Sequence, residues 1–161
     1  MFQTVVPRTE GGSPFPIIFA RPDMNATIPF CHGTHACPAY DPTGDCVVFF
    51  KDSWHVSADD IFPEGKIYAD LAANNVLHVV HCLASGDVVH SPEQQMQMQK
   101  YLQHPWACQK GLEITSHIHY RLILDLVGEA LTNFRSSREL VQAIHDALVG
   151  EWRPSSQSYV I

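Results

Sequence analysis

Residues 46–71, CVVFFKDSWHVSADDIFPEGKIYADL, decide the fold that the sequence predicts. The stretch opens with an apolar, β-rich run at 47–50, which follows a loop at 41–45 that contains proline and glycine. Such a loop suits a hairpin turn, so the run predicts a buried strand that forms the second arm of a hairpin. Lys51 should therefore stand at the inner end of that strand.

A helix is predicted next, beginning near Pro63. Residues 57–60, SADD, supply side chains that can cap a helix, and proline suits a first helical turn. Apolar side chains then recur at helical spacing, at Ile67, Tyr68 and Leu71. Glu64 belongs to the same stripe, because it lies three, four and seven positions before them.

Glu64 on the packing face of this helix needs a partner. An unpaired buried carboxylate costs several kcal/mol or changes its protonation state. Lys51, at the end of the preceding strand, is the candidate, so the pattern predicts an ion pair between the two residues. Two alternatives stay open: Lys51 could extend to solvent from a sheet edge, and Glu64 could simply cap the helix near its positive end.

Composition and charge narrow the classes of protein. The chain has 161 residues, 45% hydrophobic and 17% charged, enough for the core of one domain or of part of a larger one. Its net charge is −7 with neutral histidines and it has no basic run, so we expect no nucleic-acid partner. No stretch approaches the roughly 18 to 20 apolar residues of a membrane helix, and no signal peptide is evident. We expect an intracellular, cytoplasmic protein that does not engage a membrane.

The cysteines and histidines offer a minor alternative, a zinc site. The cysteines are odd in number and scattered, which is typical of reduced thiols: Cys31, Cys37, Cys46, Cys82 and Cys108. The histidines form three groups, with His32 and His35 among the first cysteines, His78 and His81 beside Cys82, and His117 near His119. None has the paired CxxC or HExxH spacing of zinc sites, so no metal ligand is assigned.

The region before the hairpin is predicted to be an irregular arm, 1–27, followed by extended structure. The arm holds four prolines and two adjacent glycines around one apolar run, 17–19, by which it could dock. Residues 36–40 should pair with 46–50. Pro38 places that strand at an edge or a bulge.

Further strands are expected beyond the helix. Residues 77–83 are apolar and predict a strand, residues 85–87 (SGD) a turn, and residues 88–89 a returning partner. The Gln- and Met-rich segment 91–112 is too long for a tight turn, so we expect a partly helical excursion. Residues 119–125, HYRLILD, then predict another strand.

The last part of the chain is predicted to be helical. Residues 131–134 suggest a short helical turn, and Ser136 with Glu139 matches a capping box, S-x-x-E. Apolar residues at helical spacing follow, at Leu140, Val141, Ile144 and Leu148. They predict a helix over 137–149, ended by Gly150, with a loose tail over 151–161.

Several collinear segments resemble the fungal-type protein kinase family. They are KDSW at 51–54, EGKIYADL at 64–71, ASGDV at 84–88, HIHYRLILDLVG at 117–128 and LTNFRSSRELVQAIHDAL at 131–148. The resemblance covers residues 28–150. It implies an α+β fold, with a kinase small lobe and hinge over 28–128 and the start of the helical large lobe over 129–150. The small lobe would be a twisted antiparallel sheet with one helix.

The resemblance also implies roles in ATP-dependent phosphoryl transfer to protein serine or threonine. Lys51 would orient the α- and β-phosphates of ATP, and Glu64 would hold that lysine in place. Gly33 would lie in the loop that covers the phosphates. The hinge, whose backbone groups meet the adenine, would be formed by Asp125, Leu126, Val127 and Gly128. ATP and Mg²⁺ are the implied cofactors.

Three departures from the family pattern limit these expectations. The loop at 31–35, CHGTH, offers one glycine where kinases use several, which predicts weak nucleotide binding. After the helix at 137–149 the sequence has no His-Arg-Asp loop, so the catalytic base and the magnesium ligands are missing. The chain is also shorter than a kinase domain, so we expect a chain truncated inside the domain, without turnover of its own.

A second function, from a different class, is a non-catalytic interaction module of the pseudokinase type. The apolar surface that a complete large lobe would cover would then bind a protein partner. Exposed apolar surface of that size is typical of an interaction site.

Overall fold

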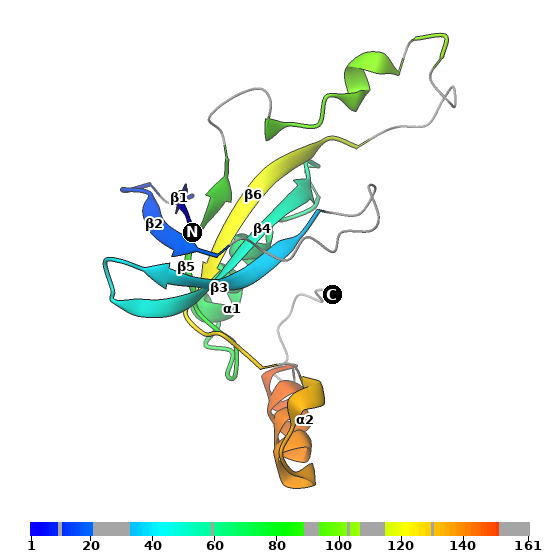
Figure 1. The fold of residues 1–161 in the computed structure, drawn as a ribbon. Coiled ribbons are helices and arrows are strands. Elements are labelled where there is room, and N and C mark those ends of the chain that lie inside the picture. Colours follow the sequence, from blue (N-terminus) through cyan, green and yellow to red (C-terminus); the bar gives the residue numbers. More distant parts are fainter. Residues whose placement is uncertain are drawn as a thin grey trace.

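The computed structural model describes residues 1–9, 11–20, 33–58, 60–88, 94–102, 104–106, 115–129 and 131–151. They form an α+β structure with six antiparallel strands in one curled sheet and two α-helices (Figure 1). The strands are β1 (Phe2–Val6), β2 (Phe15–Phe19), β3 (His35–Asp41), β4 (Cys46–Val56), β5 (Cys82–Asp87) and β6 (His117–Leu124). The helices are α1 (Glu64–Ala73) and α2 (Ser137–Glu151), with short 3-10 helices η2 (Met98–Tyr101) and η3 (Leu131–Asn133).

The strand order in the sheet is β1-β2-β3-β4-β6-β5. The first four strands form a meander, α1 lies between β4 and β5 in the chain, and β6 inserts between those two strands. The sheet curls so that β1 reaches β6. Arg121 on β6 donates from Nη1 to Thr4 Oγ1 at 2.8 Å and to the Val5 carbonyl at 3.1 Å. These bonds join the edge strand β1 to β6, the strand next to the opposite edge.

The two faces of the sheet bury separate apolar clusters. The cluster inside the curl consists of Val6, Ile17, Ala39, Val48, Phe50, Ala84 and Ile123. The cluster on the face towards α1 consists of Tyr120, Leu122 and Leu124, with Phe49 and Tyr68 packed against it. Side chains alternate between the faces of a strand, so Lys51 shares the α1 face with Phe49, and Asp52 lies on the opposite face.

The predicted hairpin between residues 36–40 and 46–50 is confirmed. β3 and β4 pair from His35↔Asp52 to Asp41↔Cys46. β4 continues to Val56 because it also pairs with β6 over its second half. Lys51 therefore lies in the middle of a strand and not at its end, which corrects the sequence-based expectation.

Residues 1–20 correct the expectation of an irregular arm. β1 and β2 form a hairpin that pairs from Phe2↔Phe19 to Val6↔Phe15, and β2 joins β3. The Phe2 and Phe19 rings are 5.9 Å apart, and Phe19 lies 5.1 Å from Phe50. Cross-strand packing of this kind stabilises strands whose local sequence is rich in proline.

The apolar run at 17–19 docks on the sheet, as predicted, since Ile17 is fully buried. It does so as the centre of β2. Residues 10 and 21–27 of the predicted arm lie outside the described residues.

The segment after α1 also differs from the prediction. The expected strand at 77–83 begins only at Cys82, and the expected turn at 85–87 is the second half of β5. β5 pairs with β6 from Cys82↔Leu124 to Asp87↔Tyr120, and this pairing outweighs the local turn signal. Val88 donates its N–H to the His119 carbonyl at 2.8 Å, so it extends that pairing and does not return along β5. Residue 89 lies outside the described residues.

α1 begins next to Pro63, as predicted, but it is capped and packed differently. Its N-cap residue is Pro63, with no side-chain cap hydrogen bond, so the described residues Ser57, Ala58 and Asp60 do not cap it. Position 59 lies outside the described residues. Ile67 is exposed, whereas Gly65 is buried and Tyr68 is partly buried. The packed face is rotated towards Gly65, because a residue without a side chain lets the helix approach the sheet.

The C-terminal elements follow the prediction. β6, η3 and α2 occupy the predicted strand, helical turn and helix, although α2 includes Gly150. The capping box forms, with one change: Glu139 N donates to Ser136 Oγ at 3.3 Å. Glu139 Oε2 accepts from Arg135 N at 2.8 Å, where a standard capping box would have it accept from Ser136 N. α2 stands apart from the sheet (Figure 1). The loose tail was predicted over 151–161, but α2 extends to Glu151, and residues 152–161 lie outside the described residues.

The excursion at 91–112 is described only in part. η2 gives its described part the partly helical character that was expected. None of the helices in the described ranges has the length and apolar character that crossing a membrane requires.

Candidate functional site

Lys51 and Glu64 meet on the α1 face of the sheet, as the sequence predicts. Lys51 Nζ lies 2.5 Å from Glu64 Oε2, and the two side chains are 27% and 34% exposed. Glu64 opens α1, and Lys51 is held at mid-strand by β3 on one side and β6 on the other. The observed geometry is that of the ion pair and not of either alternative that the sequence left open.

Apolar neighbours surround the base of this ion pair. Leu122, the β6 partner of Lys51, is fully buried, and Phe49 packs in the same cluster. Burial also raises the pKa of Tyr68, with the charge of Glu64 adding to the effect. Apolar surroundings weaken dielectric screening, so they strengthen the attraction between Lys51 and Glu64.

Gly65 is the residue that allows α1 to come close enough. Its N–H donates to the Tyr120 hydroxyl at 3.0 Å. A Cβ at this position would lie 2.0 Å from Ser85 Oγ and 2.4 Å from the Tyr120 hydroxyl oxygen. Contacts below 3.0 Å force something to move, so the sheet can accept only glycine here without displacing α1.

The predicted hinge follows β6 directly. Asp125 N donates to the His81 carbonyl at 3.0 Å, and Asp125 Oδ1 accepts from His81 N at 3.0 Å. The Asp125 N–H is therefore engaged by the segment before β5. Leu126 and Gly128 are exposed and Val127 is partly buried.

Strand register places the predicted site residues in order along β4. The hinge leaves β6 after Leu124, which pairs with Phe49, two residues before Lys51. Gly33 lies near Trp54, three residues after Lys51, since a Cβ on Gly33 would be 3.2 Å from Trp54 Cδ1. The φ of Gly33 is 51°, in the left-handed region that favours glycine. Among the described site residues, the direct contact is the one between Lys51 and Glu64.

The opposite face of β4 carries a charged cluster that the sequence reasoning missed. Asp52 Oδ1 lies 2.5 Å from His119 Nε2, and Asp52 Oδ2 accepts from Arg121 Nε at 3.1 Å. His119 also bonds to Gln94. Burial acts to raise the pKa of Asp52, but the hydrogen bonds and charges of His119 and Arg121 outweigh it and hold the pKa below its ordinary value. The sequence contained one signal for this cluster: side chains alternate between the faces of a strand, so residues 119 and 121 of β6 lie on the same face.

The histidine and cysteine groups do not form a metal site in the described part of the chain. No group of three or more His, Cys, Asp or Glu side chains is placed there to hold an ion. Burial raises the pKa of Cys37 and of Cys82, which disfavours the thiolate that binds metals. Cys31, His32 and Cys108 lie outside the described residues.

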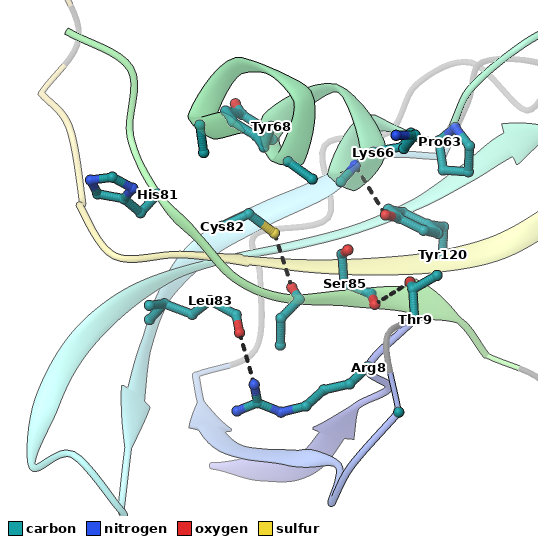
Figure 2. Close-up of a pocket in the computed structure, with 15 residues that line it drawn as sticks. Arg8, Thr9, Pro63, Lys66, Tyr68, His81, Cys82, Leu83, Ser85 and Tyr120 are labelled. Atoms are coloured by element: carbon teal, nitrogen blue, oxygen red, sulfur yellow. Dashed lines mark hydrogen bonds between the residues drawn. The ribbon is translucent and has the colours of Figure 1, made fainter. Parts of the chain in front are cut away.

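A cavity beside α1 is the second feature that the sequence reasoning missed. It has a volume of about 380 Å³ and lies between α1, β5 and the segment after β1 (Figure 2). Its walls come from three separate segments, so no single motif marks it. The local signal was Gly65, whose place on the packed face of α1 indicates a close approach between backbone and sheet.

No protein-family model, curated protein or solved structure matches the chain. The α+β class, the curled sheet and the Lys51–Glu64 contact are properties of the structure itself. The functional argument therefore starts from the geometry of that contact.

Proposed function

We propose that this chain contains the ATP-orienting part of a phosphotransferase of the fungal-type protein kinase family, which acts on protein serine or threonine. The observation that carries the proposal is the contact of 2.5 Å between Lys51 Nζ and Glu64 Oε2. A strand lysine held by a helix glutamate is the arrangement that orients ATP in protein kinases. Helical periodicity and the family resemblance predict this pair independently.

The pair would act by positioning a cation. A lysine ammonium has three N–H donors, and the contact with Glu64 uses one of them. The remaining donors are available to phosphate oxygens, and the carboxylate fixes the direction in which they point. Positioning and charge neutralisation are the main contributions that a protein makes to phosphoryl transfer.

The order of the site residues along β4 supports the same proposal. The hinge lies level with Phe49 and Gly33 lies near Trp54, with Lys51 between them. Five residues of strand span about 17 Å at the usual rise of a β-strand. A nucleotide lying along β4 would then have its adenine at the hinge and its phosphates at Lys51.

The described residues offer no site that fits magnesium. The described residues contain no group that could hold a metal ion, and Asp146, within α2, is the last aspartate in the sequence. Transfer also needs a residue that positions or deprotonates the substrate hydroxyl. The proposal for residues 1–161 is therefore ATP orientation, and transfer requires groups beyond those that this chain supplies.

ATP binding by purified 1–161 tests the proposal. We expect weak binding of a fluorescent ATP analogue, reduced about 10- to 100-fold in Lys51→Met, since a charge-assisted hydrogen bond contributes about 1.5 to 3 kcal/mol. Lys100→Met removes the same charge from η2 and should bind as the unchanged chain does. Thermal unfolding of both variants checks that each remains folded. Equal binding by the Lys51→Met and Lys100→Met variants would refute the role of Lys51.

A protein-interaction module is the second candidate, and α2 favours it. Apolar side chains of this helix are exposed, among them Val141 by 64%, Ile144 by 48% and Leu148 by 60%. They recur at helical spacing, so they form one apolar stripe on α2. If ATP binding does not depend on Lys51, this interaction function becomes the better supported one.

A further inference from the structure

We infer that the cavity between α1 and β5 is a binding site for a small organic anion, that is, a ring-sized or short-chain molecule with one carboxylate or phosphate. Neither Lys51 nor Glu64 lines this cavity. Its walls include residues of α1, residues of β5, and Arg8, Thr9 and Gly11 from the segment after β1 (Figure 2). The inference is therefore independent of the proposed function.

The charged residues among the described lining of the cavity are basic. Arg8 and Lys66 line it, with His81, and none of its described lining residues is an aspartate or glutamate; residue 10 lies outside the described residues. Lys66 is paired with Asp70 on the outer side of α1, so Arg8 is the main source of positive charge. The net charge of the whole chain, −7, matters less here, because charges beyond about 8 Å are largely screened at physiological salt.

Arg8 is held in position before any ligand arrives. Its Nη1 donates to the Leu83 carbonyl at 3.3 Å, and its guanidinium lies 5.4 Å from the centre of the Phe15 ring. A guanidinium has five N–H donors in a planar fork, so donors remain for a carboxylate or phosphate. A pre-positioned cation loses little conformational entropy on binding.

The remaining wall is suited to an apolar group. Tyr68, Ala69 and Ala72 of α1 line the cavity, as do Leu83 and Ala84 of β5. The polar groups at its base already satisfy one another, because the Tyr120 hydroxyl accepts from Gly65 N and Thr9 Oγ1 donates to the Ser85 carbonyl. A volume of about 380 Å³ lies within the usual range of small-molecule sites. A ligand with one charged end and an apolar body therefore matches both parts of the cavity.

Titrations of the isotope-labelled 1–161 chain, followed by amide NMR signals, test this inference. The probes are phenyl phosphate and benzoate, with benzyl alcohol as a neutral analogue of similar size. We expect at least one anion to shift the signals of Gly65, Ala69 and Ser85, and benzyl alcohol to leave them in place. The relative affinity of the two anions then distinguishes a phosphate site from a carboxylate site.

Two variants separate charge from space. Arg8→Gln should weaken anion binding about tenfold, because a charge-assisted bond is lost. Ala69 lines the cavity, so Ala69→Phe should block it without changing the charge. Ala69 is exposed on α1, so the larger side chain does not displace the core. Arg138→Gln, the matched charge change on α2, should bind as the unchanged chain does. The inference is overturned if neither anion binds, if benzyl alcohol binds equally well, or if binding survives both Arg8→Gln and Ala69→Phe.

Discussion

Lys51 and Asp52 are neighbours in β4, and alternation along the strand sends them to opposite faces of the sheet. Lys51 meets Glu64 of α1 on one face, and Asp52 meets His119 and Arg121 of β6 on the other. Two adjacent charges thus have separate partners and separate consequences. The first pair belongs to the proposed nucleotide site, and the second stabilises the curl of the sheet, because Arg121 also binds Thr4.

Asp52→Asn should lower the free energy of unfolding in a pH-dependent way. The folded pKa of Asp52 lies below its ordinary value of 3.8, so the stabilisation is present above pH 3.8 and is lost as the pH falls through the folded pKa. We expect a loss of about 1 to 3 kcal/mol at pH 7, the contribution of hydrogen bonds to a charged group. Urea unfolding at pH 7 and at pH 3 measures it.

Asp60→Asn, at an exposed position, is the matched control and should change stability little at either pH. A stability difference between the unchanged chain and Asp52→Asn that is as large at pH 3 as at pH 7 would contradict this account of Asp52.

At the scale of elements, α1 determines the site because it carries Glu64 and rests on the sheet through Gly65. The approach of the helix, the Glu64 contact and the cavity beside α1 all depend on that one position without a side chain. Displacement of α1 by a larger residue would therefore affect all three features together.

Gly65→Ala tests this dependence, because helix propensity and the close contact predict changes of opposite sign in the free energy of unfolding. Helix propensity alone favours alanine over glycine by about 1 kcal/mol. The clash with Ser85 Oγ and the Tyr120 hydroxyl predicts instead a destabilisation of about 1 to 3 kcal/mol, the usual cost of overpacking. Gly128→Ala, where the added Cβ meets nothing within 4 Å, is the control. A Gly65→Ala chain that is more stable to urea than the unchanged chain would show that α1 does not need this close approach.

Elements with a strong local pattern could be predicted from the sequence. The hairpin of β3 and β4, the strand β6 and the helix α2 follow from alternation, turn composition and a capping box. The Lys51–Glu64 pair could also be predicted, because a carboxylate on the packed face of a helix needs a cation.

Elements that depend on distant partners could not be predicted. β1 and β2 contain or adjoin prolines and are stabilised by aromatic contacts with each other and with β4, and β5 overrides a turn-like Ser85-Gly86-Asp87 by pairing with β6. The cavity has the same cause, since Arg8 reaches β5 only after the sheet has curled.

At the scale of the whole molecule, the chain presents two candidate sites on either side of α1 and an exposed apolar stripe on α2. The Lys51–Glu64 pair belongs to the proposed nucleotide site, and the cavity lies between α1 and β5. The central claim is that residues 1–161 can orient ATP and cannot transfer its phosphate.

A transfer assay with radiolabelled ATP tests that claim most directly. Purified 1–161 is incubated with labelled ATP, Mg²⁺ or Mn²⁺ and a generic protein substrate, beside Lys51→Met. The account predicts no transfer above the Lys51→Met background, because the sequence has no His-Arg-Asp loop after α2 and the described residues contain no metal-binding group beside the proposed ATP-orienting pair. Transfer of label by the unchanged chain that Lys51→Met abolishes would contradict the account, since the missing groups would then have to lie within these 161 residues.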